Sequence, residues 1–123
     1  ANYQYKHEFN PPHWHGGLYS FVIWMKIPYS WHEQVQLPQF QTTKLTDRKA
    51  GMFEFEYSDT RGETRSLSYQ LSPEFEGCMC FFPAWMRHSV YPFFGTDEER
   101  VSISGNIWYQ DGPPVTKGKG FGL

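Results

Sequence analysis

Apolar and polar residues along this chain mostly follow the two-residue period of β-strands, and almost no stretch follows the period of a helix. Residues 51–57 place Phe53, Phe55 and Tyr57 on one face and two glutamates on the other, and residues 65–71 alternate in the same way. Because successive side chains of a strand point to opposite faces, this alternation predicts half-buried strands. Further strands are expected at residues 3–9, 18–27, 76–82, 88–91 and 100–109, with a hairpin loop at residues 58–62.

The remaining segments have no clear period. Residues 29–49 are expected to form a long loop or insert, and residues 111–123, rich in glycine and proline, a flexible tail. Without an internal repeat or a linker, residues 1–110 are expected to form one domain. Seven or eight short strands separated by turns predict an all-β sandwich, barrel or jelly roll.

The strand at residues 100–109 has one polar and one apolar face. A dry core would not accommodate the polar face, which instead predicts a cavity that holds a charged ligand. Both faces of residues 18–27 are largely apolar, so both are expected to be covered. The polar face consists of Arg100, Ser102, Ser104, Asn106 and Trp108, and the expected outer positions are Tyr19, Phe21, Ile23, Met25, Val101, Ile103 and Ile107.

The chain contains no amphipathic helix that could cover these outer positions. Left bare, they would form a patch that soluble monomers rarely tolerate. One interpretation is that the chain is a fragment whose N-terminal part is absent. Another is that a partner chain, such as a second copy in a homo-oligomer, provides the cover, and a third is that residues 29–49 fold over it.

Composition narrows the class of protein further. Aromatic residues make up 20% of the chain, and large rings fill the interior of a small β-barrel efficiently. The net charge of −2 provides no basic field, so a nucleic-acid partner is not expected. The longest apolar run, residues 21–25, is too short to span a bilayer, and residues 1–8 lack the apolar part of a secretory signal. Two cysteines, Cys78 and Cys80, are poorly spaced for a disulfide, and reduced thiols favour a cytoplasmic protein.

Two blocks of residues suggest a metal site. His13 and His15 stand close together near the start, and His88 precedes Arg100 by twelve residues. Imidazole is a common metal ligand, and a guanidinium presents a rigid fork that matches a carboxylate. The pattern predicts a metal held between strands, with the arginine binding an anionic co-substrate beside it. The alternatives are ordinary surface or core histidines and an arginine paired with a neighbouring surface glutamate.

These blocks also carry a family resemblance. Residues 77–92, GCMCFFPAWMRHSVYP, and residues 100–109, RVSISGNIWY, resemble the C-terminal half of Fe(II)/2-oxoglutarate-dependent oxygenases. Residues 9–17, FNPPHWHGG, with the strand that follows, resemble the metal-binding strands of a subgroup common in bacteria and in the phages of marine bacteria. The resemblance covers residues 10–109. It implies a double-stranded β-helix, or jelly roll, here lacking the N-terminal helices that family members pack on one sheet.

The resemblance also implies a ligand set. Relatives bind Fe(II) through a His-x-Asp or His-x-Glu pair and a distal histidine, which corresponds here to His88. The pair corresponds to His13 and His15, with histidine in the position of the acid. Either the centre has three histidines, or His15 turns away and a water or another acid completes it.

The co-substrate 2-oxoglutarate would bind beside this metal. The resemblance implies that Arg100 binds its C5 carboxylate. Trp24 stands on the strand where relatives often place a tyrosine for the same carboxylate, so its indole N–H could serve as the donor; the alternative is a plain core residue. The further candidates for co-substrate binding are Ser102, Ser104 and Asn106.

The activity implied by the resemblance is that of a dioxygenase. Such an enzyme consumes 2-oxoglutarate and O2, forms succinate and hydroxylates a substrate, which here could be a protein side chain, a nucleobase or a small metabolite. A second hypothesis is a cupin-like metal-binding module, or a phage structural module, without 2-oxoglutarate turnover. Formation of succinate that requires Fe(II) and 2-oxoglutarate would distinguish the two.

Overall fold

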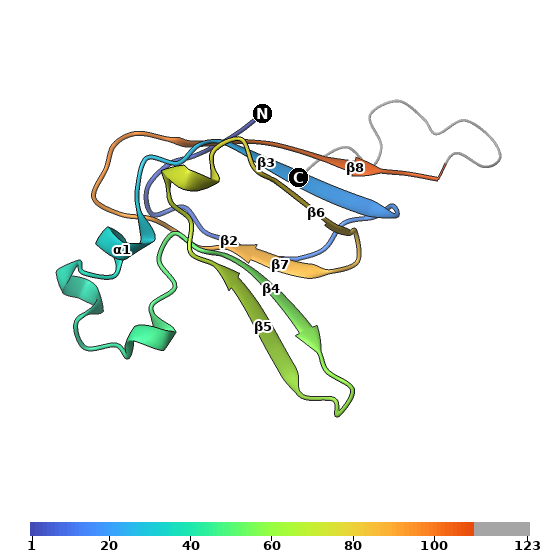
Figure 1. The fold of residues 1–123 in the computed structure, drawn as a ribbon, viewed down its shortest axis with the longest axis horizontal. Helices are drawn as coiled ribbons and strands as arrows, with labels where there is room; N and C mark the ends of the chain where they lie inside the picture. The colour runs from blue at the N-terminus through green and yellow to red at the C-terminus, as the bar shows by residue number, and fades with distance from the viewer. Residues whose placement is uncertain (110–123) are drawn as a thin grey trace.

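Two four-stranded antiparallel sheets face each other in the computed structural model, which describes residues 1–109 (Figure 1). The predicted tail at residues 111–123 lies outside the described residues. The first sheet has the order β1–β8–β3–β6, formed by Asn2–Gln4, Arg100–Ile107, Tyr19–Lys26 and Met79–Pro83. The second has the order β2–β7–β4–β5, formed by Asn10–His13, Arg87–Val90, Phe53–Ser58 and Thr64–Tyr69.

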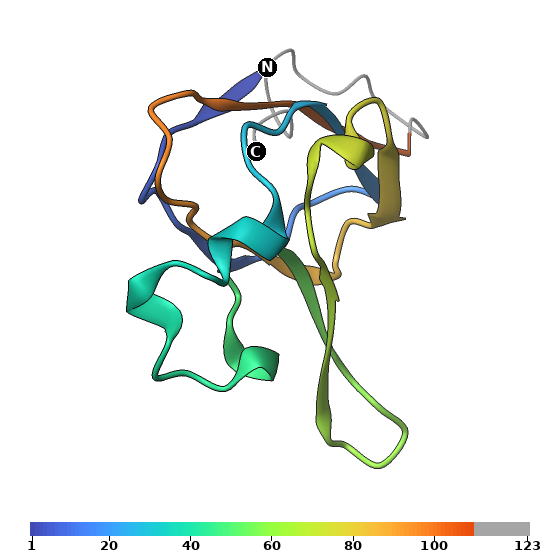
Figure 2. The same ribbon diagram turned by 60° about the vertical axis from the view of Figure 1, so that its left-hand side comes forward.

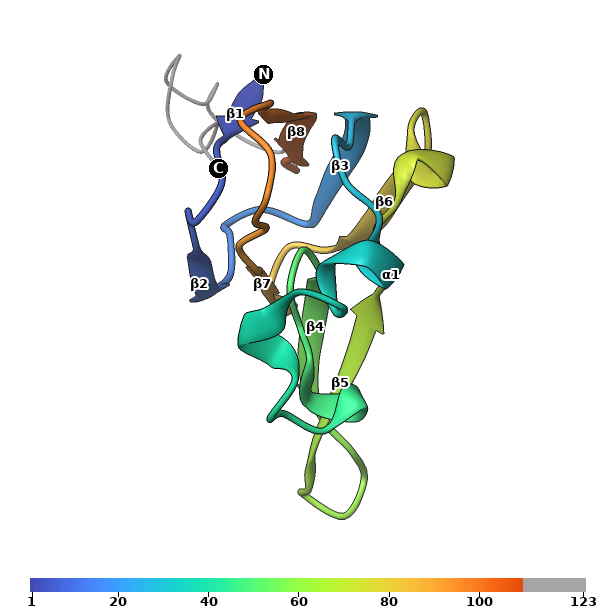
Figure 3. The ribbon, with the colours of Figure 1, turned by 90° about the vertical axis from the view of Figure 1, so that its left-hand side faces the viewer.

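The chain crosses repeatedly between these sheets. It passes from β1 to β2 and back to β3, and later from β6 to β7 and back to β8 (Figure 3). The predicted all-β, jelly-roll-type architecture is thereby confirmed. The hairpin of β4 and β5 projects beyond the body of the molecule, and its turn lies at the predicted loop.

Helical structure in the described chain is confined to short turns. The helix α1 covers Trp31–Gln34, and 3-10 helices cover Pro38–Phe40, Leu45–Asp47 and Pro73–Phe75. No helix within residues 1–109 is long and apolar enough to cross a membrane.

The segment at residues 29–49 packs on the second sheet. Trp31 and Val35 contact Met52, which precedes β4, and Tyr91, which follows β7. Figure 2 shows the segment, in cyan to green, on the side of the molecule away from β8. Of the three alternatives for the outer face of β3 and β8, cover by residues 29–49 is therefore not observed, because their apolar side chains pack elsewhere.

The N-terminal strand was predicted in the wrong place. One strand was expected at residues 3–9, ended by Pro11 and Pro12. The structure has two shorter strands instead: β1 at Asn2–Gln4, and β2 at Asn10–His13, which contains both prolines. Proline is tolerated because β2 is an edge strand whose pairing with β7 is irregular between Asn10 and His13. An edge strand needs no N–H donor on its free side.

The space between the sheets holds an aromatic core. Trp24 from β3 packs edge-on against Phe53 from β4, with ring centroids 5.6 Å apart. Phe82 from β6 packs on Phe55 in the same way, at 4.9 Å. These contacts join the two sheets and fix which face of each strand points inward.

Among the described residues the outer face of the first sheet is partly exposed, and Phe21, Ile23 and Val101 on it are half-buried. Ser20, Val22 and Trp24 are buried, whereas Tyr19 and Met25 are exposed, as the two-residue period predicts. The same prediction is confirmed in β8, where Arg100 and Asn106 are buried and Ile103 and Ile107 are exposed. Of the three expected outcomes for this face, an exposed apolar patch is the one observed in the described residues.

Candidate functional site

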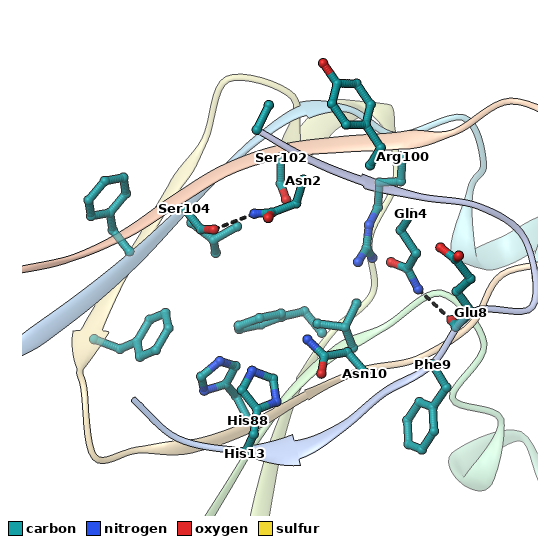
Figure 4. Close-up of a pocket in the computed structure, with 17 residues that line it drawn as sticks. Asn2, Gln4, Glu8, Phe9, Asn10, His13, His88, Arg100, Ser102 and Ser104 are labelled. Carbon is teal, nitrogen blue, oxygen red and sulfur yellow. Dashed lines mark hydrogen bonds between the residues drawn. The ribbon is translucent and has the colours of Figure 1, made fainter. Parts of the chain in front are cut away.

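A cavity of about 640 Å³ lies between the two sheets (Figure 4). Its polar lining comes from opposite sides: His88 and His13 from the second sheet, and Arg100 with two serines from the first. Apolar side chains fill the walls between them. The packing of the two sheets therefore brings the polar residues of the site together. The apolar residues that line the cavity are Phe9, Phe21, Val22, Phe53, Phe82 and Val90.

Three histidines form a cluster beside this cavity, and two of them, His13 and His88, line it. His13 ends β2 and pairs directly with His88 of β7. His15 follows in an extended segment whose position is set by a hydrogen bond from its backbone N–H to the carbonyl of Ala84, at 2.9 Å. One ligand nitrogen from each ring lies within 4.8 Å of the others, and the Nε2 atoms of His15 and His88 are 3.3 Å apart. Two nitrogens about 2.1 Å from one metal ion are separated by about 3 Å at a right angle, so this spacing suits a shared metal.

Hydrogen bonds to backbone carbonyls orient two of the rings. His13 Nδ1 lies 2.7 Å from the carbonyl oxygen of Pro11, and His88 Nδ1 lies 2.9 Å from that of Met86. A carbonyl oxygen can only accept, so each Nδ1 carries the proton and each Nε2 keeps a free lone pair. Metal-binding histidines typically show this arrangement.

The rings of His15 and His88 are held in the neutral form. Burial lowers the pKa of His88 to about 4, assisted by the nearby His13 and His15 and opposed by the hydrogen bond to Met86. Burial, and then the charge of His13, lowers the pKa of His15 as well. Neutral imidazole is the form that binds metals, so neither ring needs to lose a proton at neutral pH.

The cluster contains no carboxylate among the described residues. His15 does not turn away, because its Nε2 faces that of His88. Of the two arrangements left open by the sequence, the three-histidine cluster is the one that the structure shows.

Arg100 lies across the cavity from the histidines (Figure 4). It is 6% exposed, and its Nη1 donates a hydrogen bond to Tyr29 Oη at 3.1 Å. Within residues 1–109 it makes no ion pair, and Glu98 pairs with Lys26 instead, at 3.3 Å. The expected alternative, a surface ion pair, is not observed. A buried guanidinium without a carboxylate partner favours the binding of an anion in the cavity.

Tyr29 is a site residue that sequence reasoning missed. Its hydroxyl accepts from Arg100 and donates to the carbonyl of Gly51 at 2.6 Å, and its ring stacks on Phe93 with centroids 4.7 Å apart. Burial raises the pKa of Tyr29, while Arg100 lowers it. Tyr29 directly follows Pro28, just after the strand on which the family resemblance implies a tyrosine, and this proximity was the available signal.

The other predicted co-substrate residues divide into two groups. Ser102 and Ser104 line the cavity, and Ser104 Oγ accepts a hydrogen bond from Asn2. Asn106 and Trp24 are buried but do not line it: Asn106 accepts a hydrogen bond from Ser20 at 2.6 Å, and Trp24 belongs to the aromatic core. The structure therefore does not bring these last two residues to the site.

The segment of β1 and β2 forms a cavity wall that sequence reasoning also missed. Asn2, Gln4 and Asn10 place carboxamide groups there (Figure 4). Gln4 pairs across the sheet with Arg100, and its Nε2 donates to the carbonyl of Glu8 at 2.7 Å. Its Oε1 is buried without a partner in the described part of the chain. The alternation of polar residues with Tyr3 was the signal for this wall.

Comparisons with known proteins agree with this geometry. No curated protein and no solved structure matches the chain. The model of a family described as "Putative 2OG-Fe(II) oxygenase" matches residues 1–106. Because this match includes all three histidines and Arg100 and most of the chain, the protein belongs to this family of 2OG-Fe(II) oxygenases.

Proposed function

We propose that this protein is an Fe(II)- and 2-oxoglutarate-dependent oxygenase in which the three histidines bind the metal and Arg100 binds the co-substrate. The observation that carries the proposal is the shared cavity. His13 and His88 of the three-histidine cluster line one side of it, and on the other side lies a buried guanidinium that makes no ion pair within residues 1–109. Membership of the family supports the same chemistry.

The histidine cluster fits Fe(II). Backbone carbonyls accept hydrogen bonds from Nδ1 of His13 and of His88 and so orient both rings. Each ring would therefore present its Nε2 lone pair to the ion without a change of tautomer. Phe82 packs edge-on against His88, with centroids 4.9 Å apart, and helps to exclude water. Bound Fe(II) would supply the redox chemistry that couples O2 and the conversion of 2-oxoglutarate to succinate to oxidation of a substrate C–H bond.

Arg100 provides the recognition of the co-substrate. With one N–H engaged by Tyr29, the guanidinium keeps further donors for the C5 carboxylate, and the hydroxyls of Ser102 and Ser104 lie on the same wall. The cavity falls within the range of about 300–1,000 Å³ that is typical of small-molecule sites. The cavity is therefore large enough to hold 2-oxoglutarate.

Binding of the metal and of 2-oxoglutarate should be coupled. Three neutral imidazoles do not offset the charge of Fe(II), whereas the carboxylates of 2-oxoglutarate do. Because residues 1–109 supply no carboxylate to the cluster, the dianion is expected to raise metal affinity, and the metal must then raise the affinity for the dianion equally.

The test is calorimetric titration of 2-oxoglutarate into protein loaded with Mn(II), a redox-inert substitute for Fe(II). Binding should require the metal and be lost in Arg100→Met, which keeps the bulk of the side chain without its charge. Arg65→Met, on the exposed β4–β5 hairpin, is the matched control and should bind as the wild type does. Unchanged 2-oxoglutarate affinity in Arg100→Met would reject the assignment.

A second candidate function follows from the cluster's lack of a carboxylate within the described part of the chain. A cupin-like module, or a virion structural module, could bind a metal through three histidines without using 2-oxoglutarate. Tight Mn(II) binding together with no detectable 2-oxoglutarate binding, and no succinate formed from Fe(II), O2 and 2-oxoglutarate, would favour this function.

A further inference from the structure

The polar side chains that line the cavity differ in whether the protein itself already occupies their hydrogen-bonding groups. Asn2 donates through Nδ2 to Ser104 Oγ, and Arg100 donates to Tyr29 Oη. The two histidines of the lining each hydrogen bond a backbone carbonyl through Nδ1. Asn10, in contrast, makes no side-chain hydrogen bond within residues 1–109, so its carboxamide keeps both its N–H donors and its oxygen acceptor for a ligand.

Asn10 lies on the histidine side of the cavity, at the start of the strand that ends with His13 (Figure 4). It pairs with Val90 of β7, and Val90 pairs in turn with Phe53 of β4. The neighbouring row of the same sheet contains the pair of His13 and His88. Because His88 and Val90 are two residues apart on one strand, the two rows are separated by about 7 Å. Apolar surface therefore connects the carboxamide with the candidate metal site.

The charges of the lining disfavour an anionic group at Asn10. Among the described residues of the lining, Arg100 is the one lysine or arginine, and the proposed function assigns it to the co-substrate. Glu8 brings a carboxylate to the lining, where its Oε2 accepts from the backbone N–H of Tyr5 at 2.7 Å. A neutral amide suits Asn10 better than an anion does, because it can donate to the carboxamide oxygen and accept from the carboxamide N–H at once.

We propose that Asn10 binds the polar group of the substrate, and that the substrate is a neutral amide with an aliphatic chain. This inference rests on the proposed function and adds a substrate class to it. With its amide on Asn10, the substrate would extend over Val90 and Phe53 toward the histidine row. The C–H bond that is oxidised would then lie about 7 Å from the amide.

The test is the paramagnetic relaxation of probe protons by Mn(II), measured by NMR in protein saturated with Mn(II) and 2-oxoglutarate. The three probes have the same aliphatic chain and differ at one end: hexanamide is neutral, hexanoate is an anion and hexylammonium is a cation. Hexanamide should bind, and its terminal methyl protons should relax faster than the protons beside its amide, because the methyl end lies toward the metal. Hexanoate should bind several-fold more weakly, since it offers the Asn10 oxygen no donor.

Substitutions of Asn10 test the residue itself. Asn10→Leu keeps a similar volume without the carboxamide, so hexanamide should bind about two- to twelvefold more weakly. Asn10→Asp places a carboxylate at the same position and should change the preference from hexanamide to hexylammonium. Gln39→Leu, at an exposed position of the 3-10 helix Pro38–Phe40, is the matched control and should bind hexanamide as the wild type does. The affinity of each variant for 2-oxoglutarate is measured in parallel by calorimetry.

Several results would overturn the proposal: no binding of hexanamide by the wild type, hexanoate bound as tightly as hexanamide, the fastest relaxation at the amide end, or unchanged hexanamide affinity in Asn10→Leu. A parallel loss of 2-oxoglutarate affinity in Asn10→Leu would also overturn it, because Asn10 would then act on the co-substrate. A wild type that binds Mn(II) but no 2-oxoglutarate would reject the proposed function instead, and the probes would then be compared with Mn(II) alone. If Mn(II) does not bind or Asn10→Leu does not fold, saturation transfer from the protein to hexanamide compares the wild type with Asn10→Asp, and equal transfer would overturn the proposal.

Discussion

Removal of the Tyr29 hydroxyl should weaken co-substrate binding through Arg100. Tyr29→Phe keeps the ring that stacks on Phe93 but deletes the oxygen that accepts from Arg100 at 3.1 Å and donates to Gly51 at 2.6 Å. Without this acceptor the guanidinium loses the contact that fixes its direction. We therefore treat Tyr29 as a positioning residue whose effect passes through Arg100.

The magnitude follows from the two hydrogen bonds. A hydrogen bond to a charged group contributes about 1.5–3 kcal/mol and a neutral one about 0.5–1.5 kcal/mol. Both involve a side chain that is 5% exposed, so water does not readily replace the lost oxygen. If about half of the charged contribution, about 0.75–1.5 kcal/mol, is expressed in ligand binding, the affinity for 2-oxoglutarate falls about three- to twelvefold, because about 1.4 kcal/mol corresponds to a factor of ten. The free energy of unfolding should fall by about 1–3 kcal/mol.

The assay is a double-mutant cycle with Tyr29→Phe and Arg100→Met, using 2-oxoglutarate titrations of Mn(II)-loaded protein and unfolding in urea. Tyr29→Phe should weaken 2-oxoglutarate binding in the wild type and have little effect when Arg100 is already replaced. Tyr19→Phe, on the exposed outer face, is the control and should change neither quantity. A loss of stability with unchanged 2-oxoglutarate affinity would refute the positioning role and leave Tyr29 as a structural residue.

Three further predictions concern the histidine cluster. Gly17→Ala should lower Mn(II) affinity by displacing His15, because Gly17 has φ +100° and an added Cβ would lie 2.9 Å from the carbonyl oxygen of Ile107. The control is Gly62→Ala, where φ is +80° but the added Cβ meets no other atom within 4 Å. Equal Mn(II) affinity in the two variants would contradict this prediction. In metal-free protein, the unfolded state binds protons more tightly than the folded state between the ordinary histidine pKa of about 6.5 and the value of about 4 for His88. The contribution of His88 to the free energy of unfolding is therefore complete above pH 6.5. It is lost as the pH falls to 4, by at most about 3 kcal/mol. Urea unfolding should accordingly depend less on pH in His88→Gln than in the wild type. Finally, His15→Asp should retain Mn(II) binding while reducing the enhancement of that binding by 2-oxoglutarate, since the new carboxylate already offsets the metal charge, and an unchanged enhancement would argue against the electrostatic coupling.

Local pattern determined which faces of the strands point inward. Side chains alternate with a period of two along a strand, so the buried positions of β3 and β8 and the partly exposed outer face could be predicted from residues 18–27 and 100–109 alone. The spacing of His13, His15, His88 and Arg100 was equally visible along the chain. These features depend on neighbours in sequence, and the structure agrees with them.

Tertiary structure decided which inward residues reach the cavity. Trp24 and Asn106 share the inner faces with Arg100, yet aromatic packing encloses Trp24 and a hydrogen bond to Ser20 holds Asn106. Periodicity identifies which face of a strand points inward. It does not identify where along that face the two sheets are separated by the cavity. That position depends on the side chains contributed by the opposite sheet.

Contacts between distant segments are not encoded in the alternation of residues along a strand. Tyr29 meets Arg100 across 71 residues, and His15 meets His88 across 73. The first contact was missed because Tyr29 lies in a segment with no period, and the second was predicted from the two blocks of metal-ligand residues and from the family resemblance. Register between strands is set by long-range packing, which alternation within a single strand does not encode.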